Sequence, residues 1–443
     1  MVQYLQIAKQ YFNIVARTKR FFKVNDVKQF FQKANYWADQ FSHFCSFNPL
    51  YENYPFGTFP RVIGAGAEFT LEAPNGSNFN ALDDYIKQNK NWFFGHFGYD
   101  LKNEIEDLTS QNAERIQFPV LSFFRPIHLI HFQDNGIFIE TKADPEDVFN
   151  RILKIQKPPY AEPDTDLKPD CTKPEYINTV KTLRSHIEKG DIYEINYCMN
   201  FSGDIIDPDP VELFTKLTHL SPNPFSVLYK INNKYTISAS PERFIKKVGS
   251  EIISQPIKGT AARGSSMALD RKAKGNLEQS EKERAENMMI VDLVRNDLAK
   301  SCIPGSVKVN EMFGIYTFSQ LHQMISTVSG QLNQVSSTVD SIKNAFPMGS
   351  MTGAPKIKVM ELIEKYENSK RGLFSGSIGY FRPNNDYDFN VVIRSLFYDS
   401  NTNQLSFSVG SAITYDSEPE KEYEECLLKA SAIMALIQGK NNN

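Results

Sequence analysis

FNVVIRSLFYDSNTNQLSFSV, residues 389–409, has the pattern of two β-strands joined by a turn. Apolar, aromatic and β-branched residues dominate residues 389–398 and 405–409, whereas residues 399–403 are all polar and of the types common in turns. We therefore expect a β-hairpin here, with one continuous strand before the turn and a second strand after it.

The same strand pattern recurs on both sides of this hairpin, at residues 91–99, 121–132, 235–240 and 374–381. A helical period of apolar residues is present at residues 21–44, 176–189, 281–300 and 420–438. Strands and helices alternate without the regular spacing of βαβ units. This order favours an α+β fold with antiparallel sheets over a doubly wound parallel sheet.

Composition places the chain among globular proteins of enzyme size. Its 443 residues are 41% apolar and include 33 Phe and 20 Tyr, enough for one very large core or two ordinary cores. The net charge is −3, and no long basic run is interleaved with aromatic residues, so we expect no nucleic-acid partner. The first residues do not resemble a signal peptide, and no stretch approaches 18 uncharged apolar residues. We expect a cytoplasmic protein without a membrane partner.

The five cysteines are scattered and form no CxxC pair, which argues against a disulfide framework and against a zinc site. Five prolines lie among charged residues between positions 156 and 175 and mark a linker. We therefore predict an N-terminal region at 1–157, a proline-rich linker at 158–174, a catalytic region at 175–437 and a polar tail at 438–443.

Lys258 is the first candidate for chemistry. It lies in Pro256-Ile-Lys-Gly-Thr260, where Pro256 restricts the backbone and Gly259 releases it. A lysine amine attacks carbon only after losing its proton, which requires burial or a nearby positive charge. The alternative interpretation of the PxKG tetrapeptide at 256–259 is an exposed lysine on a turn.

Two pairs of glutamates form the second candidate site. Glu283 and Glu286 are three residues apart in one predicted helix, and Glu422 and Glu425 have the same spacing in another, so each pair shares a helical face. Lys429 follows one turn after Glu425 and could hold a substrate carboxylate beside a metal. Mg²⁺ suits such a site because it needs only one or two protein carboxylates. The alternative is that both faces are simply solvated.

Taken together, several motifs of this chain resemble those of the chorismate-utilising enzymes, and within them the aminodeoxychorismate synthase component I branch. The resemblance covers about residues 175–437 and rests on GDIYEIN (190–196), SPERF (240–244), PIKGT (256–260), ERAENMMIVDLVRND (283–297), GSMTGAPK (349–356), GSIGY (376–380), IR (393–394), GSAI (410–413) and EYEECLLK (422–429). It implies an anthranilate-synthase-type fold, in which two antiparallel sheets pack face to face with helices outside.

The resemblance also implies roles for individual residues. Glu286 and Glu425 would bind Mg²⁺, with Glu283 and Glu422 supporting the ion through water. The carboxylates of chorismate would be held by Thr260, Arg394, Lys429 and the Gly410–Ser411 segment. Catalysis would involve Lys258 as the nucleophile that adds to C2 of the ring, Glu242 as the acid for the departing C4 hydroxyl, and His322 as the family's active-site histidine.

The resemblance implies conversion of chorismate and ammonia to 4-amino-4-deoxychorismate, for para-aminobenzoate and folate synthesis. No Cys-His-Glu glutaminase region is recognisable, so a separate glutamine amidotransferase subunit is expected to supply the ammonia. Two alternatives stay open: anthranilate synthase component I, and a non-catalytic chorismate-binding homologue. Three positions depart from the family pattern: Glu194 stands in place of a glutamine, Ala412 of a glycine, and Phe374 of the tyrosine usual in anthranilate synthases.

Overall fold

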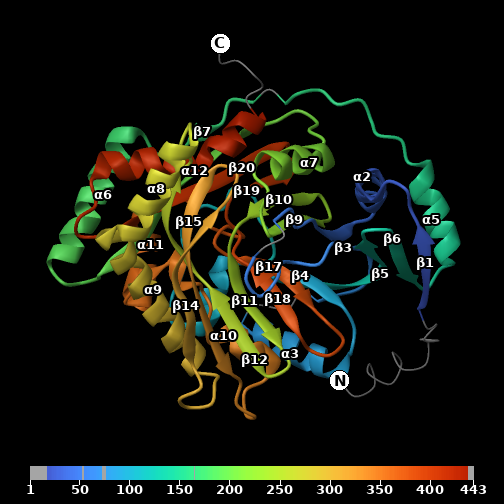
Figure 1. Ribbon diagram of the computed structural model, residues 1–443, viewed down its shortest axis with the longest axis horizontal. Coiled ribbons are helices and arrows are strands. Elements are labelled where there is room, and N and C mark those ends of the chain that lie inside the picture. The colour runs from blue at the N-terminus through green and yellow to red at the C-terminus, as the bar shows by residue number, and fades with distance from the viewer. Residues whose placement is uncertain (1–16, 52–53, 72–75, 164, 438–443) are drawn as a thin grey trace.

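The computed structural model describes residues 17–51, 54–71, 76–163 and 165–437. Long antiparallel strands form two layers, and helices lie outside them (Figure 1). The predicted α+β fold with antiparallel sheets is confirmed. Within the described residues, no helix combines the length and apolar character needed to cross a membrane.

The first layer is antiparallel throughout, and its last full strand, β8, also pairs with the two short strands β7 and β16. Its order is β1 (Thr18–Lys23), β6 (Gly136–Thr141), β5 (Leu121–Gln133), β3 (Val62–Leu71), β2 (His43–Phe47), β9 (Phe225–Ile231), β10 (Lys234–Ser240), β19 (Ser395–Asp399), β20 (Gln404–Ile413), β8 (Glu194–Asp204), then β7 (Lys168–Pro169) and β16 (Gly353–Ala354).

The second layer starts from the same long strand β5, which pairs with β3 and β4 at once and joins the layers into one hydrogen-bonded network. Its order after β5 is β4 (Phe93–Phe97), β17 (Ser377–Phe381), β18 (Tyr387–Asn390), β11 (Arg243–Val248), β12 (Glu251–Gln255), β15 (Leu321–Gln331), with β13 (Ile257–Ala262) and β14 (Lys308–Thr317) also on β15.

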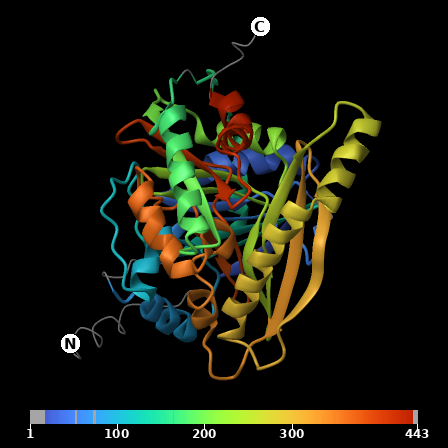
Figure 2. The ribbon, with the colours of Figure 1, turned by 90° about the vertical axis from the view of Figure 1, so that its left-hand side faces the viewer.

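Helices cover these layers on their outer sides. On the first layer they are α2 (Val27–Ala38), α5 (Pro145–Lys154), α6 (Lys173–Glu188), α7 (Pro210–Leu220), α11 (Lys356–Tyr366) and α12 (Pro419–Ile437). On the second they are α8 (Met267–Gln279) and α9 (Glu281–Ala299), which lie along β13, β14 and β15 (Figure 2). The shorter helices α3 (Asn78–Gln88), α4 (Lys102–Ile105) and α10 (Thr338–Lys343) complete the set of α-helices in the described residues.

The core between the layers is built largely from aromatic rings. Phe47 on β2 and Tyr380 on β17 belong to opposite layers, and their ring centroids lie 5.6 Å apart. Side chains alternate along a strand, so Phe44, also on β2, packs instead into the cluster beneath the outer helices. The many aromatic residues of the sequence therefore fill two cores, one between the layers and one under the helices.

The stretch 389–409 differs from the predicted single hairpin in one respect. A β-hairpin does form, between β19 and β20. The expected continuous strand before it is wrong, because β18 ends at Asn390 in the second layer and β19 begins at Ser395 in the first. The chain changes layers between them, and Arg394 adopts a positive φ of 52° in this crossing. Because the residues on both sides of the crossing are apolar, the hydrophobic pattern of the sequence does not reveal it.

The long helix expected at residues 21–44 is also wrong, since the region contains β1, α2 and the start of β2. The proposed domain boundary at 158–174 stays a prediction. Strands from both sides of that segment pair with each other, β2 with β9 and β4 with β17. Residues 438–443, predicted as a polar tail, lie outside the described residues.

A buried ion pair connects neighbouring strands of the second layer. The Arg243 guanidinium donates to both carboxylate oxygens of Asp388, at 2.9 and 3.1 Å, and the two side chains are 0% and 1% exposed. Removing one partner of such a pair leaves a buried charge uncompensated. We expect Asp388→Asn to lower the free energy of unfolding by about 3 kcal/mol, measured by urea denaturation.

The matched control is Glu418→Gln, which breaks the exposed Lys421–Glu418 pair (2.7 Å) and should leave the urea midpoint nearly unchanged. An Asp388→Asn midpoint equal to that of the control would show that the buried pair adds no net stability.

Candidate active site

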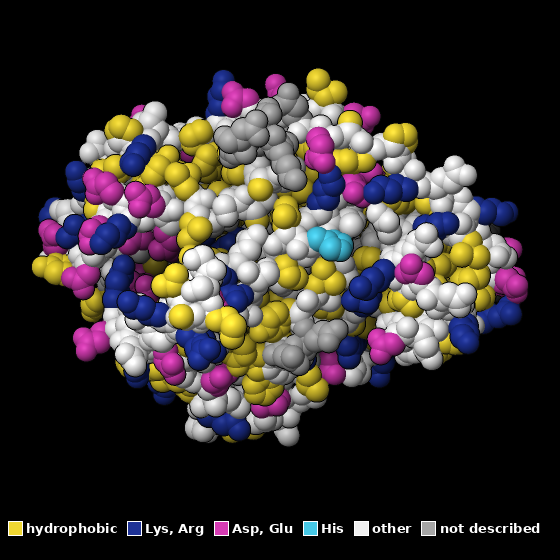
Figure 3. Space-filling view, turned by 45° about the horizontal axis from the view of Figure 1, so that its top comes forward, with side chains coloured by type: hydrophobic (Ala, Val, Ile, Leu, Met, Phe, Trp, Pro, Cys, Tyr) yellow, Lys and Arg dark blue, Asp and Glu magenta, His cyan; other side chains and the backbone are white. Residues whose placement is uncertain are grey.

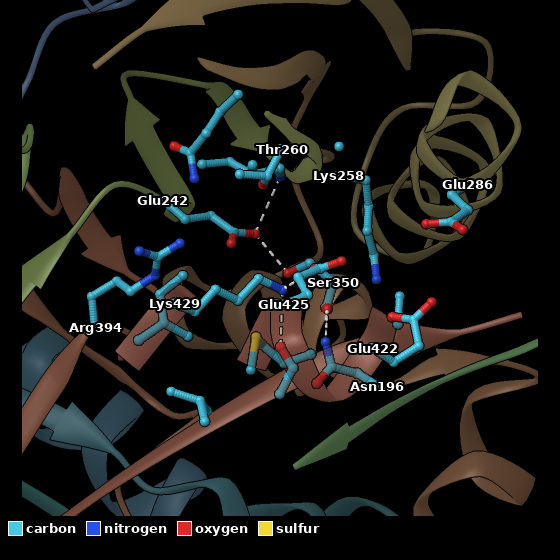
Figure 4. A pocket seen from close by; sticks show the side chains of 18 of the residues that line it. Asn196, Glu242, Lys258, Thr260, Glu286, Ser350, Arg394, Glu422, Glu425 and Lys429 are labelled. Carbon is cyan, nitrogen blue, oxygen red and sulfur yellow. Dashed lines mark hydrogen bonds and ion pairs between the residues drawn. The ribbon is translucent and has the colours of Figure 1, made fainter. Parts of the chain in front are cut away.

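One cavity, whose space including its opening to solvent is about 850 Å³, is lined from both layers and from helices α9 and α12. Figure 4 shows its polar side chains, with Arg394 and Lys429 on the left and Glu286 on the right. In the space-filling view, acidic side chains gather in a hollow on the left of the molecule (Figure 3).

Lys258 lines this cavity from β13 and is only 7% exposed. The pairing of β13 with β15 shifts register between Ile257 and Thr260, so Lys258 and Gly259 form a bulge in a strand rather than an exposed turn. Gly259 has a φ of +97°, and a Cβ there would lie 3.1 Å from a carboxylate oxygen of Glu283. The bulge thus requires glycine and turns the lysine inward.

The charge state of Lys258 differs from the expected neutral amine. Its ammonium is hydrogen-bonded to the buried carboxylate of Glu194. Burial by itself lowers the pKa of Lys258, but the carboxylates of Glu194 and Glu286 raise it above the ordinary value. Lys258 is therefore held as an ammonium and needs a proton acceptor before it can attack carbon.

The four predicted metal-site glutamates all line the cavity; Glu286 and Glu422 are buried, whereas the Glu425 side chain is 42% exposed. Glu283 and Glu286 come from α9, and Glu422 and Glu425 come from α12. Burial raises the pKa of Glu286 to about 7 and also raises that of Glu283. Burial opposes the charge of Glu425 as well, but Lys429, at 2.6 Å, holds its pKa below the ordinary value.

A cation already lies between the two helices in this structure. The ammonium of Lys282 is 3.8 Å from Glu286 and 3.5 Å from Glu422. Among the described residues, no three acidic, histidine or cysteine side chains converge closely enough to form a complete protein ligand set. Paired carboxylates with room for water fit Mg²⁺, which keeps several waters and takes few protein ligands.

The side of the cavity away from Glu286 carries positive charge for an anion (Figure 4). Arg394 enters from the crossing between β18 and β19, and no described residue forms a hydrogen bond or ion pair with its guanidinium. Burial lowers the pKa of Arg394 to about 10, so it stays charged at neutral pH. Lys429 donates to the Gly410 carbonyl at 2.9 Å, and Thr260 lines the wall beside Lys258. These groups can hold carboxylates.

Glu242 lies near the middle of this site and is 3% exposed. The Ser350 hydroxyl donates to its Oε1 at 2.6 Å. Burial raises the pKa of Glu242 to about 7, even though the Ser350 hydrogen bond opposes the shift. A carboxylic acid with such a pKa can hold a proton at neutral pH and transfer it to a leaving group.

Two predicted site residues are not brought into the cavity. His322 is buried, and its ring nitrogens lie 3.0 Å from Thr317 Oγ1 and 3.0 Å from Asp270 Oδ1, while its neighbour Gln323 lines the cavity. The Ser411 hydroxyl lies 3.1 Å from the Tyr176 hydroxyl, on the face of β20 that packs under α6 and α12. Substrate contact by either side chain stays a prediction that this geometry does not support.

Sequence reasoning missed several polar residues of the cavity wall: Asn196, Lys282, Gln323 and Ser350. Ser350 lies in the glycine-rich segment at 349–354, whose composition could have indicated it. Gln323 could have been found only by knowing which neighbour of His322 points inward.

Comparison with known proteins gives one family. Residues 47–435 match the family described as chorismate binding enzyme. The chloroplastic aminodeoxychorismate synthase of Arabidopsis thaliana is 40% identical over 60% of this chain, but the matched part is only 29% of that longer protein. Aminodeoxychorismate synthase component 1 of Salmonella typhimurium is 33% identical, over 77% of this chain and 75% of its own.

Relatives with another name are similar to nearly the same degree. Anthranilate synthase component 1 3 of Haloarcula marismortui is 31% identical, over 78% of this chain and 72% of its own. The crystal structure of anthranilate synthase component I from Streptococcus pneumoniae TIGR4 superimposes with a TM-score of 0.75, covering 87% of this chain and 93% of that one at 24% identity. This last likeness shows the anthranilate-synthase-type fold.

Proposed function

This chain belongs to the chorismate binding enzymes, and from that premise we propose that it converts chorismate and ammonia to 4-amino-4-deoxychorismate. The observation that carries the proposal is the buried position of Lys258, which lines the same cavity as the four glutamates of α9 and α12. Burying the charge of a lysine is costly, and its position in this cavity supports a role for Lys258 in the chemistry.

In the proposed reaction, the Lys258 amine forms a bond to C2 of the chorismate ring. Both ring double bonds shift by one position, and the C4–oxygen bond breaks. Glu242 gives its proton to the leaving oxygen, so water departs. Ammonia then adds at C4 and gives a proton back to Glu242, both double bonds shift back, and the C2–nitrogen bond to Lys258 breaks. The cationic side chains of Arg394 and Lys429 hold the substrate's carboxylates throughout.

Glu286 and Glu425 would hold Mg²⁺, with Glu283 and Glu422 placed to bind it through water. When bound, Mg²⁺ supplies positive charge that orients and polarises the substrate. The ammonium of Lys282 lies between Glu286 and Glu422 in this structure. This assignment therefore requires the Lys282 side chain to take another position when Mg²⁺ is bound.

The proposal includes a separate glutamine amidotransferase that delivers ammonia, because the Salmonella and Haloarcula relatives are named as first components. It also keeps a cytoplasmic location, although the Arabidopsis relative is named as chloroplastic. This proposal includes the identity of the product, its use in para-aminobenzoate and folate synthesis, and the amidotransferase partner.

Product analysis tests the proposal directly. The purified chain, given chorismate, Mg²⁺ and an ammonium salt, should form a product with the mass of 4-amino-4-deoxychorismate. Formation of fluorescent anthranilate together with pyruvate would instead assign the activity of anthranilate synthase. No turnover, despite measurable chorismate binding, would indicate a non-catalytic homologue.

The pH dependence of turnover should report the protonation of Glu242. The acid is needed in its protonated form, so turnover is expected to fall as pH rises through about 7, where burial places its pKa. Glu242→Gln removes the transferable proton and should slow turnover by roughly 10²-fold. Initial rates from pH 5.5 to 9 would check this, and the decline above neutrality should be absent in Glu242→Gln. A wild-type decline that persists in the variant assigns that pKa to another group.

A further inference from the structure

Glu194 is buried in the wall behind Lys258 and has no role in the mechanism given above. It is 0% exposed, at the first residue of β8, and it is not among the residues that line the cavity. One of its carboxylate oxygens accepts the hydrogen bond from Lys258, whereas Oε2 has no hydrogen-bond partner among the described residues. A buried carboxylate oxygen without a hydrogen-bond partner destabilises the fold, and such groups call for an explanation such as a role in catalysis.

Close contacts with Gly353 and Ala354 hold the backbone around Glu194 in place. Ala354 pairs with Glu194 in the short β16–β8 ladder, and the Tyr193 N–H donates to the Ala354 carbonyl at 2.7 Å. At Gly353 a Cβ would lie 2.1 Å from the Glu194 carbonyl oxygen, so only glycine allows this approach. The carboxylate therefore has a fixed base from which to meet the lysine.

We propose that Glu194 accepts the proton from the Lys258 ammonium and so generates the amine that attacks the substrate. The inference rests on the proposed function and assigns a positioning residue for its nucleophile. In the step, one N–H bond of Lys258 breaks, its proton bonds to a Glu194 oxygen, and the freed lone pair forms the bond to C2. The secondary ammonium produced keeps its two protons, so it leaves C2 as a neutral amine when ammonia displaces it, and the proton held by Glu194 then returns to Lys258.

Other charged groups face Lys258 from neighbouring elements, but among the described residues none of them forms a hydrogen bond with its ammonium. Glu242 accepts a hydrogen bond from Ser350 and is placed to protonate the leaving oxygen. Glu425 is paired with Lys429 on α12. The remaining two, Glu283 and Glu286 on α9, act on Lys258 only through their charge, with no hydrogen bond to its ammonium in the described residues. Glu194 alone among these groups is in hydrogen-bond contact with the proton to be removed.

The test measures the rate of covalent adduct formation at Lys258. Enzyme and chorismate are mixed with Mg²⁺ but without ammonia, quenched at short times, and the adduct is quantified by intact mass and located by peptide mapping. Each rate is compared between wild type and Glu194→Gln from pH 6 to 9. Any dependence on Glu242 cancels in this ratio, because both proteins retain that residue.

Without the acceptor, Lys258 must lose its proton to solvent. The wild-type rate should exceed that of Glu194→Gln by about 100-fold at pH 7, and the ratio should fall roughly tenfold per pH unit as hydroxide replaces the missing base. Glu194→Asp keeps a carboxylate, so the ratio of the wild-type rate to the Glu194→Asp rate should not change with pH. The Glu194→Asp rate itself should be lower than that of wild type. A Glu194→Gln rate equal to or above the wild-type rate at pH 7, or a ratio that does not change with pH, would overturn the inference.

Glu212→Gln is the matched control. Glu212 is another buried glutamate paired with a lysine, Lys157 at 2.7 Å, but it lies on α7 outside the cavity. Its adduct rate should equal that of wild type. Normal adduct formation in Glu194→Gln would exclude only the role of Glu194. Absence of any Lys258 adduct in wild type would exclude the proposed function as well as the role of Glu194.

Discussion

Lys258→Ala is expected to abolish the covalent adduct and to slow ammonia-dependent turnover by roughly 10³-fold or more. The reason is that the lysine is the only amine nucleophile buried in the cavity among the described residues, since Lys429 is paired with Glu425 and Lys282 bridges the two acidic helices. Removing it forces ammonia to attack the ring without the covalent step. Steady-state rates with ammonium and chorismate, together with intact mass after quenching, would measure both effects.

This loss should be specific to chemistry. Lys258→Ala also removes a buried positive charge, so Mg²⁺ and chorismate binding need to be measured on the same protein, by calorimetry, to show that the cavity persists. Lys308→Ala, at an exposed position on β14, serves as the control for a lost lysine. Turnover by Lys258→Ala at the wild-type rate would exclude the nucleophile role.

The features predicted correctly from sequence depend on local spacing. Glu283 and Glu286, like Glu422 and Glu425, are three residues apart, and helix geometry alone places each pair on one face. The hairpin after residue 398 follows in the same way from its polar turn. Bringing the two helices to one cavity is a long-range result, which only the family resemblance anticipated.

The features missed depend on contacts between distant segments. The crossing at Arg394 depends on β18 and β19 choosing different layers, and no local pattern separates two apolar strands from one. His322 and Ser411 were chosen from motifs, but alternation along a strand sends their side chains to the face opposite the cavity-lining neighbours Gln323 and Gly410. A motif identifies a segment more reliably than it identifies the inward-facing residue.

The charge of Lys258 is the clearest case of a property that depends on a contact between distant segments. A lysine in PIKGT was expected to lose its proton through burial or a nearby positive charge, and burial is observed. No local pattern predicts that Glu194, 64 positions earlier, forms a hydrogen bond with it. That contact reverses the direction of the pKa shift, so the missing piece of the mechanism was a proton acceptor rather than a dry environment.

Glu286→Gln and Glu425→Gln should each raise the Mg²⁺ concentration needed for half-maximal turnover by at least about 100-fold. Loss of a group that acts through another ligand typically costs 10- to 100-fold in metal affinity, and loss of a direct ligand should cost more. Glu283→Gln and Glu422→Gln, placed to act through water, should therefore show smaller shifts than the first two. Titrations of turnover with Mg²⁺, and calorimetric binding of Mg²⁺ to each protein, would rank the four.

The helices offer internal controls for this ranking. Glu281 on α9 and Glu424 on α12 are exposed, so Glu281→Gln and Glu424→Gln change charge on the same helices without touching the cavity. Neither should shift the Mg²⁺ titration, because exposed charges are screened by salt and water. If Glu286→Gln and Glu425→Gln titrate like these controls, the paired carboxylates do not bind the ion. The buried carboxylates of Glu286 and Glu422 would then serve to hold Lys282 between the helices, as it lies in this structure.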